Sequence, residues 1–329
     1  MRDEILKMLL ENKAGHLSGA TISKKLGVSR TAVWKHIQAL QQEGIQIEAV
    51  TNRGYRMLDG GNLVHPVFVD PLLNTKCLGR ALAQFSSLPS TNQLARQLAA
   101  QGCAHGTIVL AEEQTAGRGR RGRNWTNQPG KDICMSIVLR PNLEAQHAPR
   151  YTLASALGIY RLAMELGGTA SIKWPNDVLI EGKKVCGILL EMDGDMDRLQ
   201  SVIVGIGLNV NTDAFPEEIE RHATSLSLHL HKSLERNRVL ATLLNALEPL
   251  YDACEEEQAY RALLKEYTRC CGTVGQTISV IGIRETLDGV AEGIDEVGRL
   301  LLRTQDGMLH ALSAGDVTLK KPQSFSERR

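Results

Sequence analysis

The chain has 329 residues, of which 43% are hydrophobic and 23% charged, and its formal net charge is +1. This length predicts two or three domains, and the composition excludes a disordered chain. Because the charges nearly balance, any affinity for nucleic acid or phosphate must come from local clusters. Seven cysteines without a C-x-x-C pair argue against a disulfide framework or zinc site. Without a signal-peptide core or membrane span, we expect a cytoplasmic protein with no membrane partner.

The first sixty residues predict a winged helix-turn-helix domain. Helical patterns cover residues 2–12, 21–26 and 30–43, and Gly27 and Ser29 supply the turn and the N-cap between the last two. Two short strands over 45–50 and 55–58 predict a hairpin wing. Residues 16–40 contain four Lys or Arg and no acidic residue, which favours DNA as the partner over another protein.

The candidate DNA-contacting side chains lie at the start of the third helix and at the tip of the wing. Such positions reach base edges and phosphates in helix-turn-helix proteins. A double-stranded operator with two half-sites would require a dimer, because one module contacts few bases. The alternative is a protein–protein module whose charges form a solvated face. The candidates are Ser29, Arg30, Thr31, Trp34, Lys35 and Arg53.

A turn-rich segment at 59–62 predicts a linker, and a βαβ-like alternation follows it. Ser90 with Gln93 three residues later is a capping-box pattern, so we expect a helix to begin there. Ser90, Thr91 and Asn92 either form this cap or offer hydroxyl and amide groups to a neutral polar ligand. From these residues alone, the cap is the favoured interpretation.

Residues 114–131 form a strongly basic segment with four arginines, Lys131, four glycines and no acidic residue. Glycines 117, 119 and 122 fit G-x-G-x-x-G, but a dinucleotide site needs a helix after the loop. Here a strand at 106–111 precedes the loop and another at 132–139 follows it. Arginine side chains rather than a helix end must therefore bind phosphate. The alternative is a solvated basic loop without a ligand.

Three further segments carry polar groups beside apolar runs. After a helix over 149–166 that is apolar nearly all round, Lys173, Asn176 and Asp177 flank Trp-Pro at the mouth of a strand, although Pro-Asn-Asp is also ordinary turn chemistry. A hairpin turn at 181–182 leads into the strand 183–191, where Lys184 shares a face with Cys186 and is expensive to bury unless it meets an anion. The glycine-rich run 204–211 ends with Asn209 and Asn211. Together with the basic loop, these residues predict a pocket for a nucleotide phosphate and a second small acid.

The C-terminal third changes from helices to strands. Residues 233–269 are helical in pattern and include a solvated acidic run at 255–257. Short strands over 277–283, 290–294, 300–303, 309–312 and 316–319 predict a small SH3-like barrel.

Four motifs in order resemble biotin–protein ligase: Gly117–Arg123, Lys173–Asp177, Lys184–Glu191 and Gly205–Asn211. With the helix-turn-helix, the resemblance is to the bifunctional form that also represses the biotin operon. It implies an α+β fold with a winged helix-turn-helix domain over 1–60, a mixed α/β domain of the biotin/lipoate ligase type over 65–270, and an SH3-like domain over 273–320. It also implies that biotin and MgATP give biotinyl-5′-adenylate, from which biotin passes to a lysine of the biotin carboxyl carrier protein of acetyl-CoA carboxylase.

The resemblance assigns roles to individual residues. Lys184 matches the contact to the biotin carboxylate, and Arg118 and Arg120 match the loop positions that close over the adenylate; these three are the catalytic candidates. Asp177 falls at the phosphate and metal end and is the candidate ligand for Mg²⁺. The biotin contacts implied are Ser90, Thr91, Asn92, Gln114, Arg118, Gly119, Arg120 and Lys184, which gives the cap residues a second purpose. The ATP or adenylate contacts implied are Arg121, Arg123, Trp125, Lys173, Asn176 and Asn209.

Two other functions remain open from the sequence. A lipoate or octanoate ligase shares the central fold, but the arginine-rich loop and the DNA-binding module disfavour it. A non-catalytic repressor would use the same arginines to sense an effector. For the leading interpretation, we expect the basic loop to be disordered when empty and to fold as a lid, favouring a homodimer when the adenylate is bound.

Overall fold

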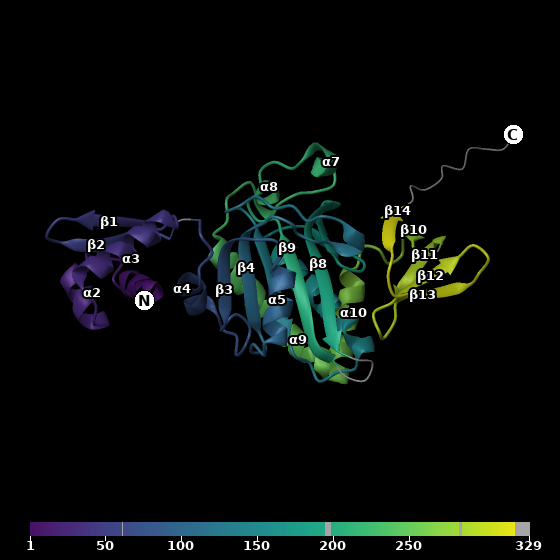
Figure 1. Ribbon diagram of the computed structural model, residues 1–329. Coiled ribbons are helices and arrows are strands. Elements are labelled where there is room, and N and C mark those ends of the chain that lie inside the picture. Colours follow the sequence, from purple (N-terminus) through teal and green to yellow (C-terminus); the bar gives the residue numbers. More distant parts are fainter. Residues whose placement is uncertain (61, 195–198, 283–284, 320–329) are drawn as a thin grey trace. The chain divides into compact units, whose positions relative to one another are not determined.

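The computed structural model describes residues 1–60, 62–194, 199–282 and 285–319, and the chain divides into two compact units (Figure 1). Residues 1–73 and 235–241 form the first unit, and residues 74–234 with those from 242 onward form the second. Three predicted positions lie outside the described residues: Gly61 of the linker, Ile283 of a strand and Lys320 at the end of the last domain. Within the described ranges, no helix is long and apolar enough to cross a membrane.

The first unit begins with the predicted winged helix-turn-helix. Helices α1 (Arg2–Glu11), α2 (Gly19–Leu26) and α3 (Arg30–Gln42) precede the antiparallel hairpin β1 (Gln46–Val50) and β2 (Gly54–Asp59). Gly27 ends α2 with a φ of 67°, and the Ser29 hydroxyl accepts the Ala32 N–H at 3.1 Å, so the tight turn and the N-cap are confirmed. The core holds Ile5, Leu9, Ile22, Val33, Ile37 and Leu40. A short α4 (Pro66–Val69) and a 3-10 turn (Asp70–Leu72) follow.

A seven-stranded mixed sheet forms the centre of the second unit. The strands are β3 (Leu82–Leu88), β4 (Thr107–Gln114), β5 (Ile133–Leu139), β6 (Ala170–Lys173), β7 (Asp177–Ile180), β8 (Lys183–Gly194) and β9 (Leu199–Leu208). Their order is β3-β4-β5-β9-β8-β7-β6, so β8 and β9 lie side by side near the middle (Figure 1). Only β3 and β4 run parallel, joined through α5 (Thr91–Ala100) as a βαβ unit. The basic loop therefore connects two antiparallel strands, β4 and β5, as predicted.

Helix α6 (Pro149–Glu165) is buried nearly all round, as its sequence predicts, and packs on β6, β7, β8 and α10 (Glu257–Cys270). The long α9 (Arg236–Glu255) precedes α10, so the segment predicted as helical forms two helices. Shorter elements are α7 (Glu217–Glu220), α8 (Leu226–Leu230) and 3-10 turns at Arg120–Gly122 and Ala145–His147.

The acidic run at 255–257 is the junction between α9 and α10, and all three side chains are exposed, as predicted. Glu256 caps α10 by accepting the N–H groups of Gln258 and Ala259. Glu257 pairs with Arg150 at 2.9 Å, and Glu255 accepts the Tyr151 hydroxyl at 3.2 Å. Each carboxylate therefore fixes the path of the chain at the helix break.

The capping box expected at Ser90 is not formed. Helix α5 does begin at Thr91, but the Ser90 side chain makes no capping hydrogen bond. Instead, Gln114 Oε1, at the end of β4, accepts the Thr91 N–H at 2.8 Å and the Thr91 hydroxyl at 3.1 Å. An acceptor from a neighbouring strand satisfies the helix end, which a local sequence pattern does not reveal.

The C-terminal strands form the predicted antiparallel sheet, in the order β13-β12-β11-β10-β14. They are β10 (Thr277–Ile281), β11 (Thr286–Ile294), β12 (Leu300–Thr304), β13 (Leu309–Leu312) and β14 (Asp316–Leu319). Strand β11 begins at Thr286 rather than Val290, because its register with β10 extends to the Thr286–Ile281 pair.

One carboxylate attaches α9 to the segment that leads into the sheet. Glu248 accepts the backbone N–H groups of Lys76, Cys77 and Leu78 at 2.6 to 2.9 Å. Burial opposes the charge, but these three donors outweigh it and lower the pKa of Glu248 below its ordinary value.

We expect Glu248→Gln to lower the free energy of unfolding by about 1 to 2 kcal/mol at neutral pH, because one acceptor oxygen is replaced by a donor facing N–H groups. A carboxyl with a depressed folded-state pKa adds stability above its unfolded pKa, and this stability is lost as pH falls through the folded value. Denaturant unfolding of both proteins between pH 7 and pH 3 should therefore show a difference that narrows in acid. A difference that widens in acid would contradict this account.

Candidate functional site

Small residues leave an open area on one face of the central sheet. In the register of β5, β9 and β8, Cys134 pairs with Gly207, which pairs with Gly187, and Ser136 pairs with Gly205 two residues along. Alternate residues of a strand share a face, so all five positions lie on the same side. Farther along this face, α5 covers the strands through contacts among Ala95, Ala99, Val109, Val138 and Ile203. The area without large side chains begins where α5 begins.

The first pocket lies in this open area, beside the N-terminus of α5. The basic loop covers it, and the strands β8 and β9 form its floor. The residues predicted to bind biotin all line it: Ser90, Thr91, Asn92, Gln114, Arg118, Gly119, Arg120 and Lys184. The other lining residues are Trp125, Met135, Asn176, Gly187, Ile188, Leu189, Gly205, Ile206 and Gly207.

A chain of polar contacts orders one wall of the first pocket. The Ser136 hydroxyl lies 2.7 Å from Thr91 Oγ1 and 2.6 Å from Asn92 Oδ1, and Asn92 donates its amide to Glu191 at 2.9 Å. Ser136 is fully buried. Ser136 and Glu191 were not among the predicted site residues, although a hydroxyl within the apolar run of β5 was a usable signal, since buried polar groups need partners.

The second pocket adjoins the first and is lined by parts of two loops, residues 115–131 and 209–224, and by residues of β6, β7 and β8. Its lining residues are Arg123, Asn124, Trp125, Thr126, Lys173, Asp177, Leu179, Gly182, Lys184, Asn209, Phe215, Ile219, His222 and Ala223. Two side chains, Trp125 and Lys184, line both pockets. The two pockets therefore meet at an aromatic ring and a cation.

Lys184 reaches this junction because of a β-bulge. Regular alternation along the strand would place the Lys184 side chain on the same face as Cys186, as predicted. The register between β7 and β8 instead shifts between the Val178–Cys186 and Leu179–Lys184 pairs, which leaves an extra residue, Val185. The Lys184 side chain consequently lies over Gly187, and a Cβ on that glycine would be 3.0 Å from Lys184 Nζ.

The charge of Lys184 is compensated in place. Its Nζ lies 2.7 Å from Asp177 Oδ1 and 5.5 Å from the centre of the Trp125 ring. The carboxylate and the ring both attract the ammonium group and hold it at the boundary of the two pockets. Asp177, the predicted metal ligand, thus has the ammonium group as a partner. Among the residues that the structure describes, no group of three His, Cys, Asp or Glu is suited to a metal ion.

The Trp125 ring lies directly on the backbone of the sheet. A Cβ at Gly207 would lie 2.3 Å from Trp125 Cε2, and one at Gly187 would lie 3.0 Å from its Cζ3. Such distances exclude any side chain at Gly207 unless the ring moves. The close backbone approach predicted from the glycines is present, and the approaching group is a tryptophan of the same chain.

The four arginines of the basic loop point to different places. Arg118 lines the first pocket, and Arg120 donates to Asn176 Oδ1 at 2.8 Å beside it. Burial lowers the pKa of the Arg120 guanidinium. Arg121 donates to the carbonyls of Ile281 and Gly282, in or next to β10, at 2.8 and 2.9 Å. Arg123 lines the second pocket and pairs with Asp316 of β14 at 2.6 Å.

The structure does not bring every predicted nucleotide-binding residue to the second pocket. Arg121 lines neither pocket described here, because the carbonyls of the C-terminal sheet hold it. Asn176 lines the first pocket rather than the second, and its Nδ2 donates to Ile188 O at 2.8 Å. Lys173 and Asn209 do line the second pocket, where Asn209 also donates to Thr224 O at 3.0 Å.

In the first unit, the predicted DNA-contacting residues are all exposed. Arg30, Thr31, Trp34 and Lys35 are exposed on α3, opposite the buried Val33, Ile37 and Leu40. Trp34 is 47% exposed, which is unusual because tryptophan side chains are buried in most proteins. Arg53 is exposed in the turn of the wing, between Asn52 and Gly54, which both have positive φ.

Comparison with known proteins places these features in one family. Residues 84–209 match the model of the biotin/lipoate A/B protein ligase family, residues 2–56 match an HTH domain, and residues 273–320 match the biotin protein ligase C-terminal domain. The biotin protein ligase of Aquifex aeolicus in complex with biotin and ATP aligns with a TM-score of 0.63 at 28% identity, covering 74% of this chain and 99% of that one.

Two relatives extend the match over nearly the whole chain. The bifunctional ligase/repressor BirA of Bacillus subtilis is 39% identical over 323 residues, which cover 95% of this chain and 98% of the relative. The protein of the same name from Escherichia coli is 29% identical and covers 96% of both chains. The order of domains, the junction of the two pockets and this identity together show that the chain belongs to the family of bifunctional biotin ligase/repressors.

Proposed function

We propose that this chain makes biotinyl-5′-adenylate from biotin and ATP, transfers the biotin to a lysine of the biotin carboxyl carrier protein of acetyl-CoA carboxylase, and represses biotin-synthesis genes. The observation that carries the ligase assignment is the meeting of two pockets at Lys184 and Trp125. A carboxylate must meet an α-phosphate for this reaction, and a cation between two adjoining pockets is suited to that approach.

In the first step, a carboxylate oxygen of biotin attacks the α-phosphorus, the bond to the β-phosphate breaks, and pyrophosphate leaves. Both reactants are anionic, so Lys184 acts by neutralising them at the point where they meet. In the second step, the amine of the carrier lysine attacks the acyl carbon and AMP leaves. No side chain of this chain serves as nucleophile; its residues contribute position and charge.

We assign biotin to the first pocket. The hydrogen-bonded wall of Thr91, Asn92 and Ser136 offers donors and acceptors without net charge, which suits a neutral cyclic urea. In this assignment Arg118, Gly119 and Arg120 of the basic loop would cover the bound biotin. We retain Ser90 and Gln114 as further biotin contacts, with Gln114 acting also through the Thr91 bonds.

We assign the nucleotide to the second pocket. Trp125 offers its ring to the adenine, together with apolar Phe215 and Ile219, while Arg123, Lys173 and Asn209 are polar contacts along the same pocket. We propose that Mg²⁺ enters as the ATP complex. The role of Asp177 as a metal ligand and that of Arg121 as an ATP or adenylate contact stay predictions.

The repressor activity is assigned to residues 1–60, the catalytic domain to 65–270 and the C-terminal domain to 273–320. We propose that α3 enters the major groove and that a homodimer places two such helices on an operator, with the adenylate favouring the dimer. Free cysteines at all seven positions agree with a reducing, cytoplasmic setting.

One assay separates the ligase from its alternatives. The full chain is incubated with ATP, apo carrier domain and either labelled biotin or labelled lipoate. Transfer of biotin alone supports the proposal, whereas transfer of lipoate favours the lipoate or octanoate ligase. No transfer with either acid, together with effector-dependent operator binding, indicates a non-catalytic repressor.

We expect Arg120→Gly to release the adenylate early, because the substitution removes the Arg120–Asn176 bond and uncovers the first pocket. Proteins without a carrier motif, such as added albumin, should become biotinylated, while the far-UV circular dichroism spectrum stays unchanged. Arg238→Ala, an exposed arginine far along the sequence, is the control. Unchanged selectivity of labelling in Arg120→Gly would show that Arg120 does not retain the intermediate.

Gly207→Ala should weaken biotin and ATP binding together, since the new methyl group displaces Trp125 from the boundary of both pockets. Overpacking of this kind costs about 1 to 3 kcal/mol, which corresponds to roughly 5- to 150-fold in affinity. Gly293→Ala is a matched control, because a Cβ on that strand glycine would have no neighbouring atom within 4 Å. Equal affinities of the two variants, measured by calorimetric titration, would rule out this role of the glycine.

For DNA binding, Arg30→Ala should weaken specific operator binding by about 1 to 3 kcal/mol and leave biotin transfer intact. Lys7→Ala, an exposed lysine on α1, provides the comparison. Gel-shift titration with the full chain measures both, and operator affinity that is equal in Arg30→Ala and the native chain would remove Arg30 from the interface.

A further inference from the structure

We propose that Asp132 is a positioning residue that fastens together the two loops lining the second pocket, and that it thereby sets the affinity for ATP. The first loop is residues 115–131 and the second loop is residues 209–224. This inference rests on the proposed function, in which the second pocket takes the nucleotide. Asp132 lines neither pocket itself, so it acts through the loops.

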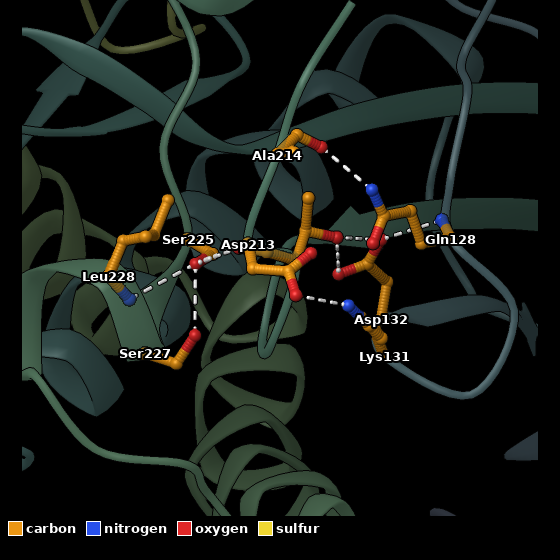
Figure 2. Close-up of polar contacts among 9 residues, drawn as sticks. Gln128, Lys131, Asp132, Asp213, Ala214, Ser225, Ser227 and Leu228 are labelled. Atoms are coloured by element: carbon orange, nitrogen blue, oxygen red, sulfur yellow. Dashed lines mark hydrogen bonds and ion pairs between the residues drawn. The ribbon is translucent and has the colours of Figure 1, made fainter.

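Asp132 is a buried carboxylate placed where both loops meet the sheet (Figure 2). It is 3% exposed and directly precedes β5. Its Oδ2 accepts the N–H of Gln128 from the first loop at 3.1 Å, and its Oδ1 accepts the N–H of Val210 from the second loop at 3.1 Å. The Thr212 hydroxyl lies 2.7 Å from both carboxylate oxygens. One side chain thus bonds to both loops.

Further contacts connect the same two segments around Asp132. Gln128 Nε2 donates to Ala214 O at 2.7 Å, and Lys131 Nζ pairs with Asp213 at 2.5 Å (Figure 2). The Asn211 N–H donates to Lys131 O at 2.9 Å. The side-chain bonds of Gln128 and Lys131 are exposed, and the Asp213 side chain is 67% exposed, so these two bonds add little beside the buried Asp132.

The second loop is also closed on itself at this point. Ser225, fully buried, donates its hydroxyl to Thr212 O at 2.6 Å and accepts the Leu228 N–H at 3.2 Å at the start of α8 (Figure 2). Thr212 and Ser225 flank residues 213–224, so the loop leaves and returns at one place. Fixing Thr212 therefore fixes the base of the whole second loop.

The position of the second loop affects the second pocket and not the first, because only the second pocket is lined by it. The second loop supplies Asn209, Phe215, Ile219, His222 and Ala223 to the second pocket and no residue to the first. Detaching Thr212 from Asp132 should therefore alter the nucleotide side and spare the biotin side. A residue that served only general stability would not separate the two substrates in this way.

The chemistry at this position requires a carboxylate. All three groups that approach Asp132 in the bonds above are donors: two backbone N–H groups and one hydroxyl. An asparagine would replace one acceptor oxygen with an NH₂ group, which faces donors in a buried site and leaves one of them unsatisfied.

Two kinds of variant test the proposal in the full chain. Asp132→Asn removes one acceptor and should loosen both loops. Thr212→Val keeps the shape of the side chain but removes the hydroxyl, so it should loosen the second loop alone, and Thr212→Ser restores the hydroxyl. Glu248→Gln is the matched control, because this carboxylate also accepts hydrogen bonds from three donor groups but lines neither pocket.

The readouts are the KM for ATP in adenylate formation and the Kd for biotin measured by calorimetry without ATP. We expect Thr212→Val to raise the KM for ATP on the order of tenfold and to change the biotin Kd less than about twofold, with Thr212→Ser close to the native chain. Glu248→Gln should lower the melting temperature without moving either constant.

A native KM for ATP in Thr212→Val overturns the proposal, whether or not Asp132→Asn folds. Equal effects on ATP and biotin overturn it as well, because they indicate general loosening. Failure of the native chain to form the adenylate would instead refute the proposed function, so the two failures are distinguishable.

Discussion

The close approach of Trp125 to the sheet is the contact on which the rest of the site depends. Its indole lies where side chains would otherwise project, because Gly207 and Gly187 have no Cβ. The ring divides one open area into two pockets that share a boundary, and it provides the aromatic surface toward which Lys184 is drawn. Without these glycines the basic loop would lie above the sheet, and no boundary between a carboxylate-binding and a phosphate-binding pocket would exist.

Charge is distributed around this boundary in a way that suits a reaction between two anions. Lys184 is held by Asp177 on one side and the ring on the other, so its ammonium group is already in place before a substrate approaches. The loop arginines are divided between the pockets and the C-terminal sheet, where Arg121 and Arg123 bind carbonyls and Asp316. The C-terminal domain thus takes part in holding the loop that covers the site.

The strands of the sheet and the loops over the second pocket are held in different ways. Strands β5, β8 and β9 are hydrogen-bonded along their length, whereas the loops bond to the strands at separate positions, such as Asn127 to Glu112 and His222 to Lys184, and bond to each other around Asp132. We expect the loops rather than the strands to change when a ligand binds. This division gives a physical basis for coupling between occupancy of the site and the loop surfaces near it.

The sequence by itself determined the helix-turn-helix, the strands on either side of the basic loop and the C-terminal strands, because periodicity and turn residues act over a few neighbouring positions. Most of the residues around the first pocket were implied by the resemblance of four motifs to biotin–protein ligase. The tertiary structure alone decided that Gln114 caps α5 and that a bulge at Val185 turns Lys184 toward Gly187. It also decided that Arg121 bonds to carbonyls of the C-terminal domain, that Ser136 bonds to the wall of the first pocket, and that Asp132 bonds to both loops. Each of these depends on partners distant in the chain, whose positions are set only when the strands pair and pack.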